Sequence, residues 1–198
     1  MNKEGKNKLR NLIIGAMLTA IGIMIPMVMP VRIVFGPASF TLASHVPVMI
    51  AMFFSPLMSA FVAIGTAVGF MMAIPEPTIW LRALSHLIFA VIGAWYLQKH
   101  PQIIESKIGL QTFNMIIAVM HAAIESGVVF AFYALGFRGI DQSALWNFLV
   151  IIGLGGIVHS FVDFNLAFYI SKVLSKAFSI EVFDKAKELF NKKELVEF

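Results

Sequence analysis

The stretch that decides the fold is IWLRALSHLIFAVIGAWYL, at residues 79–97. It is apolar over almost its whole length, and about 20 such residues suffice for a helix to cross the hydrocarbon core of a membrane. Two ionisable residues, Arg82 and His86, nevertheless lie inside it. Because such groups are costly to expose to lipid, the stretch indicates a membrane-spanning helix that carries polar side chains into the interior of a bundle.

The rest of the chain repeats this apolar pattern. Of the 198 residues, 59% are hydrophobic and only 13% are charged, whereas about 25% of the residues of an average soluble domain are charged. Prolines and polar breaks divide the apolar residues into six predicted spans, at residues 11–29, 42–54, 56–73, 79–97, 112–135 and 145–174. The second is short for a span, so we expect it to be tilted or partly buried by its neighbours. We therefore predict an all-α protein: a six-helix transmembrane bundle that forms a single membrane domain over residues 1–198.

Lysine and arginine residues are distributed unevenly between the two sides of this bundle. With six spans both chain ends share one side, which holds twelve basic residues against two, Arg32 and Arg138, on the other. Because basic loops stay in the cytoplasm, we expect cytoplasmic N- and C-termini in a multi-pass protein of the plasma membrane. Orientation thus explains the net charge of +4, and no nucleic-acid partner is expected. The tail, residues 176–198, fits an amphipathic cytoplasmic helix on the membrane surface or, equally, a frayed end.

Ionisable residues are rare inside the predicted spans, and they come in pairs four residues apart. The pairs are Arg82 and His86, His121 and Glu125, and His159 and Asp163. Residues at this spacing share one helix face, so three helices each present a polar stripe that should face inward and meet the others. One explanation is that these groups only satisfy one another and hold the bundle together. Three convergent pairs favour the other explanation, an interior cavity that binds a small molecule and opens to the outside.

Depth in the membrane predicts a role for each candidate residue. Arg82 and Trp80 lie near the outer end of their span. Arg82 is therefore the best candidate to bind a ligand from outside, since a guanidinium binds a carboxylate through two parallel hydrogen bonds. Glu125 and Asp163 are better explained as partners of the histidines. The candidate substrate-binding residues are Phe40, His45, Trp80, Arg82, His86, Glu125 and His159.

The segment between the first two spans, residues 31–42, is apolar for a loop and lies outside by the charge count. Phe35, Phe40 and a turn at Gly36 and Pro37 are placed to fold back over the mouth of a pocket. Equally, the loop lies on the lipid headgroups as surface connections commonly do.

Metal binding and catalysis are not expected. Imidazole binds zinc, nickel and cobalt, but the chain has no HxxxH pair, and we place His121 well below His86 in the membrane. Cysteine is absent, which excludes thiolate sites. Ser85 and His86 are adjacent, so their side chains point apart on a helix. The sequence thus predicts no catalytic residues, no metal and no cofactor.

Small residues mark close helix contacts. Ala16 and Ala20 lie four apart on the first span, a pattern that lets a second helix approach closely. Packing within the bundle is the commoner use of such a pattern.

Together these features resemble a substrate-specificity subunit, the S component, of an energy-coupling factor (ECF) vitamin transporter. The resemblance rests on a length near 200, six spans, a basic N-terminus leading into the Ala16-xxx-Ala20 helix, the apolar outer loop, and the stretch SFTLASHVP at residues 39–47. It implies that the chain is not an enzyme and binds a water-soluble vitamin near the outer surface. It also implies that the Ala16 and Ala20 face docks on a membrane coupling protein, the T protein, which carries two cytoplasmic ATPases. The chain has no GxxxxGK[ST] loop of its own.

The stretch at residues 39–47 is most similar to members assigned to niacin or pantothenate, both carboxylates that suit Arg82. Nickel and cobalt members carry an early histidine, which this N-terminus lacks. The sequence does not separate these two vitamins, and other vitamins stay open. Two other functions stay open as well. One is a stand-alone proton-coupled carrier or channel that uses the intramembrane His, Glu and Asp residues as a relay. The other is a structural membrane protein without a ligand.

Overall fold

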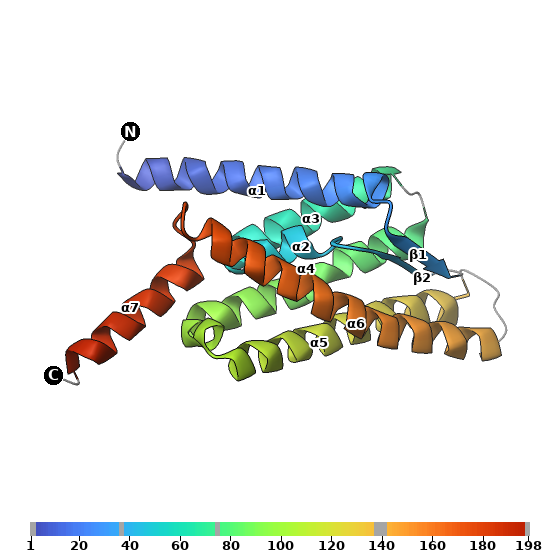
Figure 1. Cartoon of the computed structure of the whole chain (residues 1–198). Coiled ribbons are helices and arrows are strands. Elements are labelled where there is room, and N and C mark those ends of the chain that lie inside the picture. The colour runs from blue at the N-terminus through green and yellow to red at the C-terminus, as the bar shows by residue number, and fades with distance from the viewer. Residues whose placement is uncertain (1–2, 36–37, 74–75, 137–141, 197–198) are drawn as a thin grey trace.

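The computed structural model describes residues 3–35, 38–73, 76–136 and 142–196 (Figure 1). In chain order its elements are α1 (Lys3–Val28), β1 (Arg32–Phe35), β2 (Ala38–Thr41), α2 (Val46–Met52), α3 (Pro56–Ala73), α4 (Pro77–Lys99), the 3-10 helix η1 (Pro101–Glu105), α5 (Lys107–Ala134), α6 (Gln142–Leu174) and α7 (Glu181–Val196). The predicted all-α fold class is confirmed. One difference is that the outer loop forms an antiparallel hairpin, in which Ile33 pairs with Phe40. The expected turn at Gly36 and Pro37, the side chain of Phe35 and Arg138 lie outside the described residues.

Four helices in the described part of the chain are long and apolar enough to cross a membrane. They are the segments Gly5–Val28, Pro77–Lys99, Lys107–Ala134 and Leu145–Leu174. The apolar segment Pro56–Met72 is shorter. Helix α5 also begins five residues before the predicted span at 112–135, because residues 107–111 form its first turn after the cap at Ser106, whose side chain accepts from the Gly109 N–H.

Helix α2 explains why the second predicted span is so short. It has only seven residues, all of them buried, and it packs against α1, α3, α4 and α6. The aromatic ring of Phe53, directly after α2, lies 5.8 Å from that of Phe164 and 5.5 Å from that of Phe183. Helix α2 therefore forms the centre of the hydrophobic core, and its N-terminal end is held where the polar stripes meet.

Small residues join α1 to α3. Thr19 packs on Gly65 and Ile23 packs on Gly69, each so closely that a methyl group on the glycine would overlap with the facing side chain. Ala16 and Ala20, in contrast, are exposed on the other side of α1. The internal contact therefore uses the glycines and leaves the Ala16 and Ala20 face uncovered by the described chain.

We expect Gly69→Ala to destabilise the protein by about 1–3 kcal/mol, because the new methyl group forces α1 away from α3. Gly127→Ala on α5 is the matched control. A Cβ there meets nothing within 4 Å, so the same change should be neutral or stabilising by about 0.5–1 kcal/mol through helix propensity. Denaturation in mixed micelles, followed by tryptophan fluorescence, measures both. Equal effects of the two substitutions would contradict this packing.

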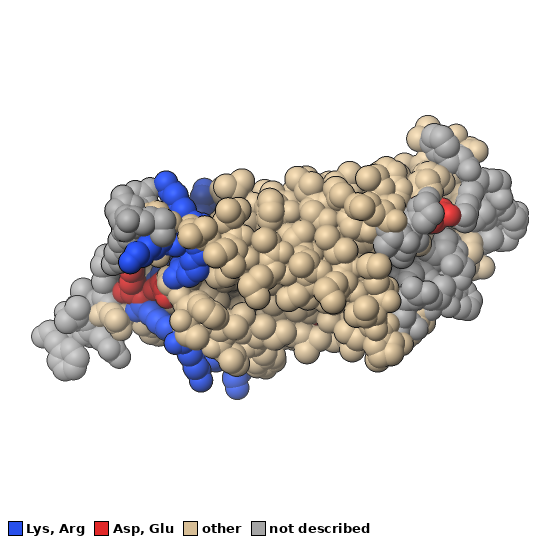
Figure 2. Space-filling view, turned by 90° about the horizontal axis from the view of Figure 1, so that it is seen from above, with Lys and Arg blue, Asp and Glu red and all other residues tan. Residues whose placement is uncertain are grey.

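The molecule has one strongly basic end. Both chain termini and α7 lie at this end, and the β1–β2 hairpin lies at the other (Figure 1). Figure 2 shows Lys and Arg side chains gathered there beside an uncharged flank. The tail forms a helix, α7, which buries Val182, Phe183 and Ala186 and exposes Leu189 and Phe190. The Val182 N–H donates to the Phe53 carbonyl oxygen at 3.1 Å, so α7 is docked on the bundle.

Candidate binding site

The three polar stripes meet in the interior, as their spacing predicts, and His45 joins them. Helix α4 supplies Arg82 and His86, α5 supplies His121 and Glu125, α6 supplies His159 and Asp163, and the turn before α2 supplies His45. We call these seven residues the polar cluster. Apart from the half-buried His159, all are at most 7% exposed.

Glu125 is the centre of one half of the cluster. Its Oε2 accepts a hydrogen bond from Arg82 Nη2 at 2.8 Å. Its Oε1 lies 2.9 Å from His86 Nε2 and 3.4 Å from His121 Nε2. A buried carboxylate needs such partners because burial removes its hydration. Arg82, the predicted ligand-binding residue, is thus also the charge partner of Glu125.

Asp163 is the centre of the other half. Its Oδ1 accepts from the Ala43 N–H at 2.9 Å, and its Oδ2 accepts from the His45 N–H at 3.1 Å. The His45 ring nitrogen Nδ1 lies 3.1 Å from the same Oδ2. Ala43 has a φ of 65°, a left-handed conformation that costs a non-glycine residue about 1 kcal/mol or more. The carboxylate of Asp163 therefore fixes the strained turn that places His45 in the cluster.

The His45 ring connects the two halves. Its centroid lies 4.5 Å from the ring of His121, 4.6 Å from that of His86 and 4.8 Å from that of His159, always edge to face. His159 Nε2 in turn lies 3.2 Å from Ser44 Oγ. Four imidazoles from four parts of the chain thus lie in contact between two carboxylates.

The prediction that His121 lies well below His86 is wrong, since the two ring centroids are 5.0 Å apart. His86 lies just under four helical turns before Lys99, the last residue of α4, and His121 lies just under four turns after Lys107, the first residue of α5. At the pitch of an α-helix, both lie about 20 Å from the basic end. The error arose because the hydropathy boundary at residue 112 placed the start of α5 too late.

His121 and Asp163 belong to the cluster but were not among the candidate substrate-binding residues. His159 also lies just under four turns before Lys172, which is in the last turn of α6. His86, His121 and His159 therefore lie at nearly the same distance from the lysine at the basic end of their helix. Counting residues from that lysine is the sequence signal that places His121 level with the other two histidines. Ser44 had no comparable signal, because its position depends on the turn.

The hairpin covers the α6 side of the cluster. The Phe40 ring lies 5.8 Å from the His159 ring in an edge contact, and a Cβ on Gly155 would lie 2.8 Å from Phe40 Cζ. The missing side chain of Gly155 therefore lets Phe40 lie against α6. Trp80 is half-buried two residues before Arg82, a separation that directs the two side chains to different sides of α4.

Several buried polar atoms of this region have no hydrogen-bond partner among the described residues. They are Arg82 Nε, both ring nitrogens of His121, and the Tyr133 hydroxyl. Tyr133 lies eight residues beyond Glu125 on the same face of α5, about 12 Å nearer the hairpin end. It packs in an apolar group formed by Phe40, Val129, Tyr133, Leu145, Leu149, Ile151 and Ile152. Buried polar atoms are normally paired, so these atoms are available to a ligand.

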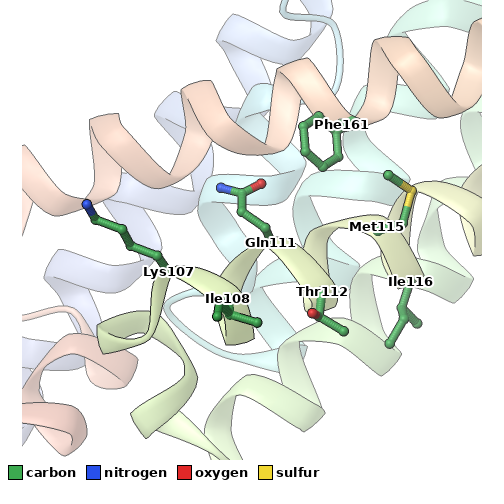
Figure 3. A pocket seen from close by; sticks show the side chains of 7 residues that line it. All are labelled: Lys107, Ile108, Gln111, Thr112, Met115, Ile116 and Phe161. Carbon is green, nitrogen blue, oxygen red and sulfur yellow. The ribbon is translucent and has the colours of Figure 1, made fainter.

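Two surface grooves lie away from the cluster. One, of about 640 Å³, follows the N-terminal part of α5 beside α6, with Lys107, Gln111 and Phe161 among its residues (Figure 3). The other, of about 380 Å³, lies along α1 between Lys6 and Met17. Neither contains a predicted substrate-binding residue, and both are lined mainly by apolar side chains.

One curated relative covers almost the whole chain. The niacin transporter NiaX of Lactococcus lactis subsp. cremoris (strain MG1363) is 61% identical over 195 residues, which are 98% of this chain and 88% of the relative. No family model and no solved structure matches the chain. The relative confirms the resemblance to an S component of the niacin type. The chain therefore belongs to the family of the niacin transporter NiaX, as a membrane transport protein and not an enzyme.

Proposed function

We propose that the chain is the S component of an ECF-type importer and captures niacin from outside the cell. The observation that carries this proposal is the buried Arg82, whose Nε is unpaired although its Nη2 is held by Glu125. This guanidinium has N–H groups left for an anion, and the full-length relative is named as a niacin transporter.

The chemistry of niacin suits this region. Niacin is a pyridine ring with one carboxylate, and a guanidinium recognises a carboxylate by parallel charge-assisted hydrogen bonds. The apolar group that contains Phe40, Val129, Tyr133 and Ile152 would receive the flat ring, and a histidine of the cluster would donate to the ring nitrogen. Since the cluster is closed by its own contacts, entry of niacin requires the hairpin and Phe40 to move away from α6.

The orientation supports capture from outside. The basic end would face the cytoplasm, with both termini there, and the hairpin end would face outward. Helices α2 and α3 together would complete the six crossings of a plasma-membrane protein. Arg82 then lies almost five helical turns from the basic end of α4, or about 25 Å, in the outer half of the membrane.

The partners would be a membrane coupling protein and two cytoplasmic ATPases. Ala16 and Ala20 are exposed on α1, next to the exposed Ile13 and Met17. Small residues in such a surface let a partner helix approach closely. This exposed face of α1 is therefore the proposed docking surface.

We expect Arg82→Ala to weaken niacin binding by at least about 100-fold, since the guanidinium would donate two charge-assisted hydrogen bonds to the carboxylate and each contributes about 1.5–3 kcal/mol. Isothermal titration of the purified protein with niacin measures this. Arg10→Ala, at the basic end, is the matched control and should bind like the wild type. Arg82→Lys keeps the positive charge but loses the paired N–H donors of the guanidinium, so its niacin affinity should lie between those of Arg82→Ala and the wild type.

An unchanged affinity in folded Arg82→Ala protein would remove Arg82 from the site. Transport requires a further test, in which niacin uptake is measured in liposomes with and without the coupling module and ATP. The proposal expects uptake only with both. Uptake by this chain alone, abolished by a proton uncoupler, would instead establish the stand-alone carrier.

A further inference from the structure

We propose that the polar cluster contains a binding site for a divalent transition-metal ion, formed by His45, His86, His121 and Glu125. These side chains come from the turn before α2 and from α4 and α5, and all four are buried. No sequence motif indicates the site, because the ligands are distant in the chain and meet only in the fold.

The geometry is close to that of a four-coordinate site. One potential ligand atom from each residue lies within 4.8 Å of all the others. A tetrahedral zinc ion with bonds of about 2.0–2.1 Å needs ligand atoms about 3.3 Å apart. Glu125 Oε1 already lies 2.9 Å from His86 Nε2 and 3.4 Å from His121 Nε2. Small rotamer adjustments at the widest pair would therefore close the site around the ion.

The strongest single observation concerns His121. Its side chain is 1% exposed, and neither ring nitrogen has a hydrogen-bond partner among the described residues. A buried imidazole normally satisfies both nitrogens, because each lost hydrogen bond costs stability. The Nε2 atom approaches Glu125 Oε1 only at 3.4 Å. A metal ion between these atoms would satisfy the ring nitrogen and the carboxylate together.

Groups next to the four ligand side chains orient them, as hydrogen-bond partners of the ligands do in known metal sites. His45 Nδ1 lies 3.1 Å from Asp163 Oδ2, the carboxylate–histidine arrangement that directs the other ring nitrogen toward a metal. Arg82 holds Oε2 of Glu125 at 2.8 Å and leaves Oε1 facing the histidines. Two of the four ligands are thus fixed before any ion binds.

The charges of the cluster favour a divalent cation. With neutral imidazoles, the form in which histidine binds metals, Glu125 and Asp163 carry two negative charges and Arg82 carries one positive charge. A divalent ion changes the net charge of the cluster from −1 to +1, and a bound ligand with one carboxylate would bring this net charge to zero. That last step, in which niacin completes the charge balance, rests on the proposed function, whereas the metal site does not. Three imidazoles and one carboxylate select zinc, cobalt or nickel over magnesium or calcium.

The test uses the full-length protein, purified in detergent, stripped with a chelator and titrated with Zn²⁺ or Co²⁺. We expect one equivalent of Zn²⁺ to bind at micromolar affinity or better, and Co²⁺ to give the visible absorption of a tetrahedral site. His121→Ala should weaken Zn²⁺ binding by at least about 100-fold, since the loss of an outer partner alone typically costs about 10–100-fold in metal affinity. His100→Ala is the matched control, because His100 caps α4 outside the cluster and should leave binding unchanged.

The inference is overturned if the wild type binds no stoichiometric Zn²⁺ and shows no Co²⁺ absorption. It is also overturned if folded His121→Ala binds Zn²⁺ like the wild type. The Co²⁺ spectrum needs only the wild type, so it decides the question even if the variant does not fold. Niacin titration of the same protein separates the two proposals. A protein that binds niacin but no Zn²⁺ overturns this inference alone. A protein that binds Zn²⁺ but no niacin overturns only the proposed function.

Discussion

Glu125→Gln is expected to lower the free energy of unfolding by about 3–5 kcal/mol, the cost of leaving one member of a buried ion pair without its partner. Arg82 is 6% exposed and Glu125 is 3% exposed, so water cannot replace the lost carboxylate. The substitution preserves the size of the side chain, so the lower free energy of unfolding would result from the removed charge. Detergent denaturation, monitored by the fluorescence of the three tryptophans, measures it.

A second glutamate provides the control. Glu181 and Lys185 pair at 2.7 Å on α7, but their side chains are 50% and 41% exposed. Glu181→Gln should therefore cost less than about 1 kcal/mol. The double variant Arg82→Gln with Glu125→Gln should recover much of the loss, because no unpaired charge stays buried. A cost for Glu125→Gln as small as that of Glu181→Gln would contradict the paired, buried state of Arg82.

Asp163→Asn should be the second most damaging substitution, at about 3 kcal/mol, because hydrogen bonds to a charged acceptor contribute about 1.5–3 kcal/mol each. The carboxylate accepts from the backbone N–H groups of both Ala43 and His45. The amide of asparagine cannot accept at both oxygen positions. The turn should open and withdraw His45 from the cluster, and niacin affinity should fall together with stability.

Ala43→Gly tests the same turn from the opposite direction. Glycine adopts the φ of 65° without strain, so this variant should be more stable by up to about 1 kcal/mol. Combined with Asp163→Asn it should recover part of the loss. Hydrogen exchange at the amides of residues 43 and 45 should accelerate in Asp163→Asn alone. Unchanged exchange there would show that Asp163 does not hold the turn.

Much of the cluster could be predicted from the sequence, because Arg82, Glu125 and Asp163 each lie four residues from a histidine. This spacing determines the face of a helix, and the face pointed inward because lipid does not solvate charge. Spacing does not determine the level of a residue along the bundle. That level depends on where each helix begins, which is why the sequence pattern places His121 too deep.

The hairpin could not be predicted from the sequence, and the shortness of the second span predicted only that it is tilted or partly buried by its neighbours, of which the structure shows burial. The strands of residues 32–35 and 38–41 are stabilised by pairing with each other, and single strands this short carry a weak pattern. Helix α2 is apolar on every side, so hydropathy gives it no inner and outer face, and the extent of its burial could not be predicted. Its burial by four neighbouring helices is a property of the assembled bundle.

Competition between niacin and nicotinamide tests most directly whether the buried guanidinium of Arg82 reads a carboxylate. The two ligands share the pyridine ring and differ in one group, a carboxylate against a neutral amide. We predict that unlabelled niacin displaces radiolabelled niacin from the purified wild-type protein, and that nicotinamide is at least about 100-fold weaker, because a site built for one polar group rejects an analogue that leaves it unpaired. Equal displacement by both compounds, or no binding of niacin, would contradict this account.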